Sequence, residues 1–361
     1  MPVRTRPDLD DLAGFSTVPI PADAIELAAN ELPFGPLDPV IEVIGRAAGR
    51  VHRYPDSSGR VLREHLAGRF GVTPGQVSLG AGSIALCLQL AQLTSEPGDE
   101  IVFPWPSFEA YSLIVRTVGA TARRVPLRPD GRVDLTALAD AVGDRTRLVF
   151  VCTPNNPTGA DLGRAELEKF FDSVPEDVLV VLDEAYWEFV RRPDALDGMA
   201  YVRDRSAAGR GNVVALRTFS KAYGLAGMRI GYGVSSEDVA ERLRRLALPY
   251  SVSSVAQAAA VASLDADEAL AVRCAAVIEE RERVRTELLG LGHEVPVSGA
   301  NFLWLGLGPH ADAFRRHCLE RGVLVKAFPG EGVRITVGIG DENARFLAAA
   351  AEFRTPAGPA L

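Results

Sequence analysis

The stretch NVVALRTFSKAYGLAGMR, residues 212–229, places a lysine and an arginine just beyond an apolar run that is typical of a buried strand. Two other stretches have the same arrangement, RLVFVCTPNNPTG at residues 147–159 and VLVVLDEAY at residues 178–186. In an open α/β sheet, ligands bind in the crevice beyond the carboxyl ends of the strands. We therefore expect the polar residues of these three loops to meet in one site.

Apolar runs and helical stretches alternate along most of the chain, which predicts an α/β fold. Further strands are expected at residues 100–104 and 229–234, and runs that are apolar on both faces are typical of a mostly parallel sheet covered by helices. One helix is expected to start with Asp38 as its N-cap, followed by Pro39. Another is expected to start at Ser235, whose spacing to Asp238 is close to a capping box.

The pattern changes after about residue 246, where two longer helical runs are expected at residues 252–264 and 267–289. Shorter helical runs are expected at residues 312–319 and 342–353. Helices beside a small antiparallel sheet are typical of a second, smaller α+β domain. The strand-like pieces of that domain are HEVPV, NFLWL, VLVKAF and VRITVG, which begin at residues 293, 301, 323 and 333.

The chain has 361 residues, a formal net charge of −8 and 47% hydrophobic residues, which are ordinary values for a globular protein of about two domains. The excess of acidic residues disfavours nucleic acid as a partner, because no basic surplus is available to displace phosphate counterions. No apolar run approaches the roughly 18 residues of a membrane helix, and the start MPVRTRPDLDDLAG lacks an apolar secretory segment, so we expect a cytoplasmic protein without membrane contact. The scattered cysteines and histidines predict core-filling thiols and no metal site.

A pyridoxal phosphate enzyme needs a lysine amine, an anion for the ring nitrogen, donors for the phenolic oxygen, an aromatic face and a phosphate cradle. Taken singly, each of the three loops has an ordinary interpretation: a Pro/Asn turn, a solvated acidic loop, and a lysine near a helix start. Taken together with the rest of the chain, they offer a candidate for every group in that set. The joint placement favours a pyridoxal phosphate site.

Four motifs resemble, in the same order, those of the fold-type I pyridoxal phosphate aminotransferases. The first is similar to the early motif of the branch that contains histidinol-phosphate and aromatic amino-acid (phenylalanine) aminotransferases. The resemblance extends from about residue 30 to residue 338. The motifs are Asn30-Glu31-Leu32-Pro33-Phe34-Gly35, Asn155-Asn156-Pro157-Thr158-Gly159, Asp183-Glu184-Ala185-Tyr186, and Ser220-Lys221-Ala222-Tyr223-Gly224-Leu225-Ala226-Gly227 with Arg229.

The resemblance implies an aspartate-aminotransferase-like α/β fold of type I. Residues 30–245 would form the large cofactor-binding domain, with a mostly parallel seven-stranded sheet sandwiched by helices. Residues 246–361 would form the smaller α+β C-terminal domain. Residues 1–29 would be an N-terminal arm that joins this small domain.

The resemblance also implies the catalytic roles. Lys221 would attach pyridoxal 5′-phosphate covalently and, once free, move a proton at the substrate Cα. Asp183 would hold the proton on the pyridine nitrogen. Asn155 and Tyr186 would donate to the phenolic oxygen, and the ring of Phe108 would stack on the cofactor.

The phosphate of the cofactor is expected at a helix N-terminus, where backbone amides point at an anion. Many relatives have acidic residues just after the Gly-x-Gly-Ser sequence, whereas Ile84-Ala85 stand here. Tyr54 matches a tyrosine that reaches the phosphate of the neighbouring subunit, which implies a homodimer. The expected cradle consists of Gly82, Ser83, Ile84, Thr218, Ser220 and Arg229.

The expected substrates are a small amino acid and a 2-oxo acid. Arg334 matches the family arginine that binds an α-carboxylate, and Asn30 belongs to the same expected substrate site. Lys326 stands where relatives often have a second arginine, and it lacks the fork that suits phosphate, which disfavours a phosphorylated substrate. An aromatic L-amino acid with 2-oxoglutarate is therefore preferred to histidinol phosphate of histidine biosynthesis, which remains the alternative. Candidates to line an apolar substrate pocket are Phe15, Phe34, Trp105 and Tyr250.

Three other classes of function compete with this interpretation. Residues 80–85, GAGSIA, match a dinucleotide-binding pattern, but the acid that should end the next strand is missing, which weakens a nicotinamide dehydrogenase. Decarboxylases and β-eliminating lyases share the fold and the lysine, and no motif states which bond at Cα breaks. A catalytically silent binding protein is disfavoured because Lys221 and Asp183 are both present.

Overall fold

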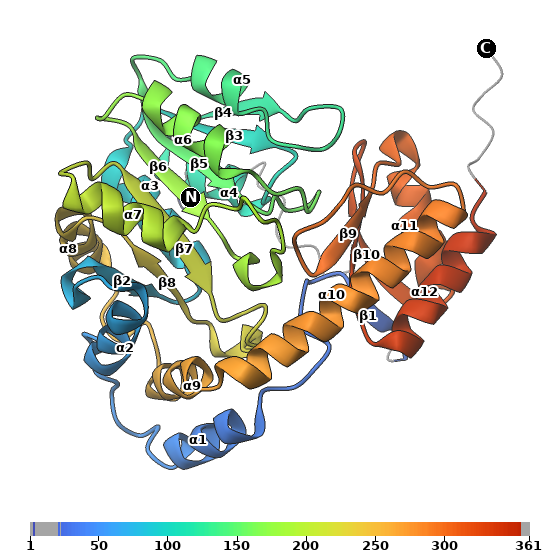
Figure 1. Ribbon diagram of the computed structural model, residues 1–361, viewed down its shortest axis with the longest axis horizontal. Coiled ribbons are helices and arrows are strands. Elements are labelled where there is room, and N and C mark those ends of the chain that lie inside the picture. Colours follow the sequence, from blue (N-terminus) through green and yellow to red (C-terminus); the bar gives the residue numbers. More distant parts are fainter. Residues whose placement is uncertain (1–2, 4–20, 22, 355–361) are drawn as a thin grey trace.

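The larger sheet of the protein has seven strands in the order β2-β8-β7-β6-β5-β3-β4 (Figure 1). These are seen in a computed structural model that describes residues 3, 21 and 23–354. Neighbouring strands are parallel, except that β8 runs antiparallel to both β2 and β7. The predicted mostly parallel seven-stranded sheet is thus confirmed. The strands are β2 (Val77–Gly80), β3 (Glu100–Trp105), β4 (Thr121–Pro126), β5 (Thr146–Cys152), β6 (Leu179–Asp183), β7 (Val213–Thr218) and β8 (Gly231–Val234).

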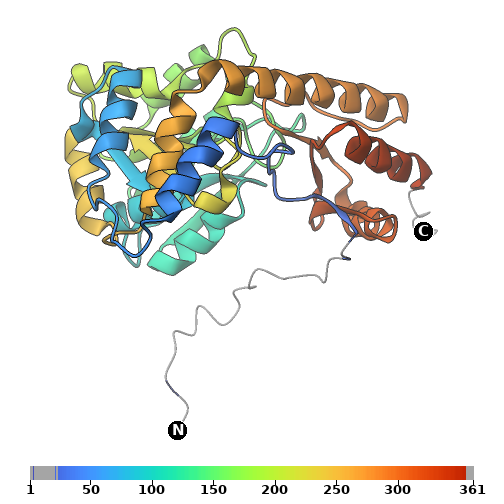
Figure 2. The same ribbon diagram turned by 90° about the horizontal axis from the view of Figure 1, so that it is seen from below.

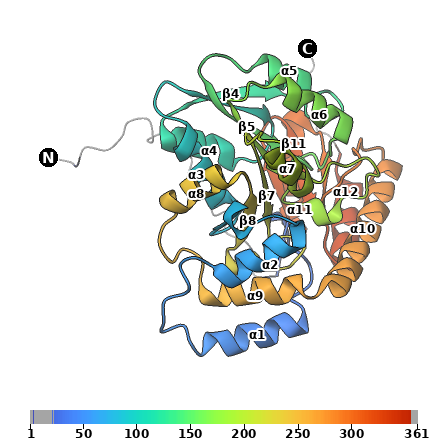
Figure 3. The same ribbon diagram turned by 60° about the vertical axis from the view of Figure 1, so that its left-hand side comes forward.

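Helices cover both faces of this sheet (Figure 3). Successive strand residues point to opposite faces, and in β5 Val149 and Val151 enter one apolar cluster whereas Leu148 and Phe150 enter another. Burial on both sides explains why these strands are apolar throughout. The helices are α2 (Arg60–Phe70), α3 (Ser83–Thr94), α4 (Ala110–Val118), α5 (Leu135–Asp140), α6 (Arg164–Ser173), α7 (Gly198–Ala207) and α8 (Glu237–Leu246), with short 3₁₀ turns at Pro74–Gln76, Trp187–Phe189 and Ala226–Met228.

A smaller sheet of four strands, in the order β1-β10-β11-β9, forms a second layer with its own apolar core. β10, β11 and β9 are antiparallel neighbours, whereas β1 lies parallel to β10. Strand β1, which precedes the strands of the large sheet in the sequence, therefore forms one edge of the small sheet. The elements are β1 (Ile25–Leu27), β9 (Phe302–Leu305), β10 (Val323–Phe328), β11 (Gly332–Thr336), α11 (Ala311–Glu320) and α12 (Gly340–Glu352), with a 3₁₀ turn at Gly308–His310.

The long helix α10 (Asp267–Gly290) connects the two domains (Figure 2). Its residues Cys274 and Val277 belong to the core of the large domain, and Val284 and Leu288 to the core of the small domain. Helices α1 (Asp38–Ala48) and α9 (Ser254–Leu264) lie side by side on the large domain, and α9 also packs on α2 (Figures 1 and 3). The domain boundary at residue 246 stays a prediction.

Two helix starts differ from the prediction by one residue. Leu37 is the N-cap of α1, and Asp38 is its first helical residue, where a negative charge suits the positive end of the helix dipole. Ser236 rather than Ser235 caps α8, because the Ser236 hydroxyl accepts the backbone N–H of Val239 at 3.4 Å. The capping box expected from Ser235 is therefore wrong.

The strand expected at residues 293–297 is also wrong. The guanidinium of Arg285 donates to the carbonyls of Val295 and Pro296, so these acceptors are used by a side chain instead of a neighbouring strand. The edge strand β4 was missed because most of its side chains are exposed and polar, which hides the strand pattern. The three-residue strand β1 gives too short a pattern to be recognised.

None of the described helices is long and apolar enough to cross a membrane. Within residues 23–354, no group of three or more His, Cys, Asp or Glu side chains is arranged to hold a metal ion. All four cysteines are free and buried, so the prediction that they fill the core is confirmed.

Candidate active site

A cavity of about 350 Å³ lies between the two domains at the carboxyl ends of β6 and β7. It brings together the predicted site residues except Asn155 and Tyr54. Two neighbours in its wall, Asn156 and Glu109, were not assigned a role from the sequence. The predicted residues in the wall are Asn30, Gly82, Ser83, Ile84, Phe108, Asp183, Tyr186, Thr218, Ser220, Lys221, Arg229, Lys326 and Arg334.

Lys221 follows β7, and its Nζ donates to the backbone carbonyl of Ala29 at 2.9 Å. Burial, together with the positive charge of Arg334, lowers the pKa of Lys221 to about 7. A lysine amine is a nucleophile or a base only when it has lost its proton. At neutral pH a large fraction of Lys221 is therefore in the reactive form.

Asp183, the last residue of β6, lies in the wall of the cavity. Its Oδ2 accepts the hydroxyl of Tyr111 at 2.7 Å, whereas its buried Oδ1 has no hydrogen-bond partner among the described residues. Burial raises the pKa of Asp183 to about 6, and the hydrogen bond from Tyr111 opposes this rise. A buried acceptor without a partner is costly unless a ligand satisfies it. The geometry suits a cationic N–H donor.

Tyr111 was missed by the sequence analysis, although it stands three residues after Phe108 on the same turn of chain. Its ring is fully buried and stacks on Phe150, with ring centroids 4.4 Å apart. Burial raises the pKa of Tyr111 well above its usual value, so the phenol stays protonated and donates to Asp183. Tyr111 thus orients the Asp183 carboxylate and leaves the other oxygen free.

Tyr186 lies in the cavity wall, where Asn30 fixes the position of its hydroxyl. The side-chain amide of Asn30 donates to the Tyr186 hydroxyl at 2.9 Å. Asn30 has a positive φ of 54° and is held by Thr336, whose hydroxyl accepts the Asn30 backbone N–H at 2.9 Å. Burial raises the pKa of Tyr186, so its hydroxyl remains a donor at neutral pH.

The prediction for Asn155 needs correction, because its side chain does not line the cavity. Its Oδ1 accepts the hydroxyl of Ser107 at 2.8 Å, and its Nδ2 donates to Thr158 at 3.1 Å. The side chain of the next residue, Asn156, is the one in the cavity wall. Asn155 therefore holds the loop together, and Asn156 faces the site.

The predicted phosphate cradle is a helix N-terminus with hydroxyl and guanidinium groups around it. Helix α3 begins at Ser83 after Gly82, which has a φ of +76° that a side chain disfavours. The Thr218 hydroxyl donates to Ser220 at 3.0 Å, and Arg229 lies 3.4 Å from the same Ser220 hydroxyl. Such a cluster of backbone and side-chain donors suits an anion.

Gly231 of β8 lies directly against this cradle. A Cβ at Gly231 would be 2.3 Å from the backbone nitrogen of Ser83. We expect Gly231→Ala to displace that amide and to weaken the binding of pyridoxal phosphate to the purified apoprotein by roughly 10-fold or more, the value of one hydrogen bond to a charged group. Absorbance titration measures the dissociation constant.

The matched control is Gly227→Ala, because a Cβ at Gly227 meets no atom within 4 Å. Its dissociation constant is expected to stay close to that of the natural chain. Equal affinities for the two variants, with both folded by circular dichroism, would contradict the place assigned to the cradle.

Arg334 of β11 is buried, and its guanidinium is held at the cavity wall. It donates to Asn156 Oδ1 at 2.5 Å and to the carbonyl of Ala28, and its Nε has no partner among the described residues. A positioned guanidinium with donors to spare suits a carboxylate.

Tyr54 lies outside the cavity of its own chain, and the residue is 83% exposed. Its ring stacks on Tyr250, with centroids 4.6 Å apart. The contact of Tyr54 with a neighbouring subunit stays a prediction.

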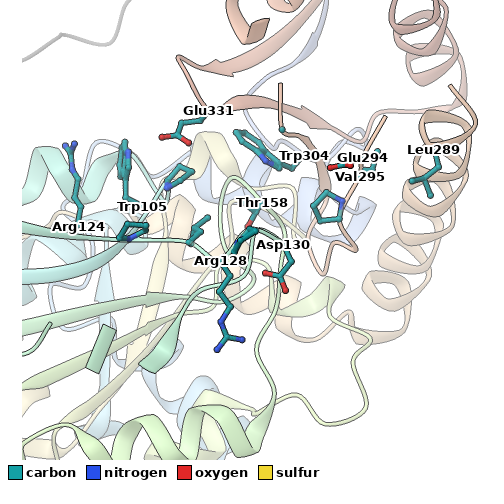
Figure 4. A pocket seen from close by; sticks show the side chains of 17 residues that line it. Trp105, Arg124, Arg128, Asp130, Thr158, Leu289, Glu294, Val295, Trp304 and Glu331 are labelled. Carbon is teal, nitrogen blue, oxygen red and sulfur yellow. The ribbon is translucent and has the colours of Figure 1, made fainter. Parts of the chain in front are cut away.

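Of the residues expected to line an aromatic substrate pocket, none of the three that the structure describes lines the active-site cavity. Phe34 and Tyr250 do not line the active-site cavity, and Phe15 lies outside the described residues. Trp105 lines a separate cavity of about 720 Å³, formed with the small-domain residue Trp304 (Figure 4). No lysine lines this second cavity, so it lacks an amine like that of Lys221. Its Arg124 lies over the Trp105 ring, with the guanidinium carbon 4.4 Å from the ring centroid.

The sequence model of the family "Aminotransferase class I and II" matches residues 22–350, and the chain belongs to this family. Among curated proteins, the aromatic amino acid aminotransferase of Streptomyces avermitilis is 50% identical over 331 residues, which are 92% of this chain and 91% of that protein. The protein of the same name from Nocardia farcinica is 49% identical over 355 residues, 98% of each chain.

Solved structures show the same fold. The histidinol-phosphate aminotransferase from Sinorhizobium meliloti, in complex with pyridoxal-5′-phosphate, is 29% identical, with a TM-score of 0.86 over 97% of both chains. The aspartate aminotransferase from Thermus thermophilus with maleate is 25% identical, with a TM-score of 0.78 over 91% of this chain and 90% of that one. The protein is therefore an aminotransferase with the fold of type I.

Proposed function

We propose that this enzyme uses pyridoxal 5′-phosphate to transfer the amino group of an aromatic L-amino acid to 2-oxoglutarate, which gives an aryl 2-oxo acid and L-glutamate. The observation that carries the proposal is one cavity whose wall contains both Lys221 and Asp183, a carboxylate with one oxygen that has no hydrogen-bond partner among the described residues. Relatives that share about half of the sequence carry the name of this activity, which supports the choice of donor.

The residues present fit this cofactor. Ser83, Ser220 and Arg229 would hold its phosphate, and the free Asp183 oxygen would accept its ring N–H. Asn156, in place of Asn155, and Tyr186 would contact its phenolic oxygen, while Phe108 would cover one face of its ring. When bound, pyridoxal phosphate supplies an electron sink that stabilises negative charge at the substrate Cα.

The chain itself supplies binding, orientation and proton transfer. Arg334 would bind the α-carboxylate and so fix the Cα–H bond relative to Lys221. The Lys221 amine, with its pKa lowered to about 7, would take the Cα proton and return it later. Because Arg334 holds the carboxylate, loss of the proton is favoured over decarboxylation.

The donor preference is supported by Glu109, which lines the cavity and pairs with Lys326. Lys326 presents a single point charge, which can hold one carboxylate but lacks the two-pronged contact that suits a phosphate dianion. Its pairing with Glu109 also neutralises that charge while no second carboxylate is present. The uncharged ring of an aromatic amino acid needs no such contact.

We expect Arg334→Ala to act mainly on substrate binding. The loss of the guanidinium should raise KM for phenylalanine by roughly 10- to 100-fold, because a charge-assisted contact with the carboxylate is removed. Steady-state kinetics measures the change, and the absorbance band of the bound cofactor should remain. An unchanged KM would contradict the role of Arg334.

Arg334→Lys serves as the control, since a lysine keeps the charge but loses the fork. Its KM is expected to fall between those of the natural enzyme and the alanine variant.

A half-reaction screen tests the proposed function. The cofactor-loaded enzyme is mixed in turn with phenylalanine, tyrosine, tryptophan and histidinol phosphate, and the loss of the cofactor absorbance band is followed. Rapid loss with the aromatic amino acids supports the proposal. A faster reaction with histidinol phosphate would replace it with the alternative function.

We also propose that the active form is a homodimer in which Tyr54 contributes to the partner's cofactor site. The exposed side chains of Val51, Tyr54, Leu248 and Tyr250 give this part of the large domain an apolar surface. Exposed apolar residues that gather in this way are typical of subunit contacts.

A further inference from the structure

The proposed function requires one cavity to accept two different side chains. In the first half of the reaction it receives an uncharged aromatic ring, and in the second half it receives the second carboxylate of 2-oxoglutarate. The inference below rests on that function and concerns the pair formed by Lys326 and Glu109.

This ion pair bridges the two domains inside the active-site cavity. Lys326 belongs to β10 of the small domain, and Glu109 is the N-cap residue of α4 in the large domain. The Lys326 Nζ lies 3.0 Å from Glu109 Oε2, and both side chains line the cavity.

The other cationic side chains of the cavity wall already have tasks. Lys221 is the reacting amine, Arg229 lies at the phosphate cradle, and Arg334 is the candidate for the α-carboxylate. Among the described residues of the wall, Lys326 is the remaining cation. It is the group available for a second carboxylate.

The register of the small sheet places Lys326 beside Arg334. The two residues are direct partners across the antiparallel pair β10–β11, so their side chains leave the same face of the sheet. A substrate whose α-carboxylate lies at Arg334 can therefore direct the far end of a short diacid toward Lys326.

The residue type also fits an exchange of partners. The chain has 39 lysine and arginine residues, of which only Lys169, Lys221 and Lys326 are lysines. An ammonium group on a flexible stem is a point charge that can change partner without breaking a two-pronged contact, as an arginine would have to do. The Lys326 and Glu109 side chains are 38% and 49% exposed, and pairs with this exposure contribute little to stability. Opening the pair therefore costs little.

We propose that Lys326 exchanges partners during the catalytic cycle. With an aromatic amino acid in the cavity, Lys326 stays paired with Glu109, and its charge is neutralised near the ring. With 2-oxoglutarate or glutamate, Lys326 leaves Glu109 and binds the distal carboxylate, while Glu109 turns to solvent. One pair thus serves both substrates.

The test uses two ligands that bind without reacting, glutarate and 3-phenylpropanoate. Their dissociation constants are measured by isothermal titration calorimetry on the cofactor-loaded enzyme. For Lys326→Met we expect binding of glutarate to weaken by roughly 10- to 100-fold, because a charged contact is lost. Binding of 3-phenylpropanoate should change by less than about threefold, because the methionine keeps the apolar stem.

Glu109→Gln provides the opposite result. Without the competing carboxylate, Lys326 is free, so glutarate should bind several-fold more tightly. The affinity for 3-phenylpropanoate should not increase. The matched control is Lys169→Met, which removes the same charge from an exposed position on α6, outside the cavity. Its two dissociation constants should equal those of the natural enzyme.

The exchange is overturned if Lys326→Met leaves glutarate binding within about twofold of the natural value, or if it weakens both ligands equally. It is also overturned if Glu109→Gln weakens glutarate. The half-reaction with phenylalanine, followed in the natural enzyme, reports separately on the proposed function. Turnover of phenylalanine without the expected glutarate effects would reject the exchange alone.

Discussion

Replacement of Lys221 by alanine is expected to abolish transamination, with a fall in turnover of at least roughly 10⁴-fold. The amine would both attach the cofactor and move the proton at Cα, and among the described residues of the cavity wall the other lysine, Lys326, is paired with Glu109. Turnover is measured with phenylalanine and 2-oxoglutarate. Borohydride treatment followed by peptide mapping should fix the cofactor to residue 221 in the natural enzyme and nowhere in the variant.

The matched control for this prediction is Lys169→Ala, which removes an exposed lysine of α6 and should leave turnover unchanged. A small primary amine added to the Lys221→Ala enzyme should restore part of the activity, because it supplies the missing base from solution. Appreciable turnover of the variant without added amine would show that Lys221 is not the reacting group.

Asp183→Asn is expected to lower the rate of the chemical step by roughly 10²- to 10³-fold. Removal of one preorganised electrostatic contact in an active site typically has an effect of this size. Asparagine has the shape of aspartate but no negative charge, so the ring nitrogen would lose the anion that keeps it protonated. Single-turnover measurement with phenylalanine reports the chemical step. A rate close to that of the natural enzyme would contradict the role of the carboxylate.

The same role of Asp183 predicts the direction in which cofactor affinity changes with pH. Because burial raises the pKa of Asp183 to about 6, the carboxylate is charged above pH 6 and becomes neutral below it. A protonated ring stabilises the charged form, so affinity is highest above pH 6 and is lost as the pH falls through 6. Asp183→Asn should lack this part of the dependence and keep the part due to the Lys221 amine. Asp183→Glu keeps the charge and should recover part of the rate.

Much of the fold could be predicted because the deciding strands are apolar on both faces. Runs such as that of β6 are buried throughout, and the polar residue at the end of each run marks the site. The edge strand β4 and the short β1 carry no such pattern, because their pairing depends on neighbours that the local sequence does not reveal. The order of the motifs predicted the site, whereas strands β4 and β1 could be recognised only in the folded chain.

The direction of side chains in loops was the main feature of the site that could not be predicted from the sequence. The sequence shows two adjacent asparagines, and only the path of the loop after β5 decides that Asn155 turns to Ser107 and Asn156 to the cavity. Tyr111 and Glu109 were missed for a different reason. Their partners, Asp183 and Lys326, are far away in sequence, so no spacing rule connects them.

The pairing of β1 with β10 ties the reacting amine to the position of the small domain. Immediately after β1, the carbonyl of Ala28 accepts from Arg334 and that of Ala29 accepts from Lys221. A hinge rotation of the small domain would carry these carbonyls along with β10, whereas Lys221 is anchored to the large sheet. Such a movement would break the hydrogen bond between the Lys221 amine and the Ala29 carbonyl, and would thereby link the availability of the amine for cofactor attachment to the separation of the two domains.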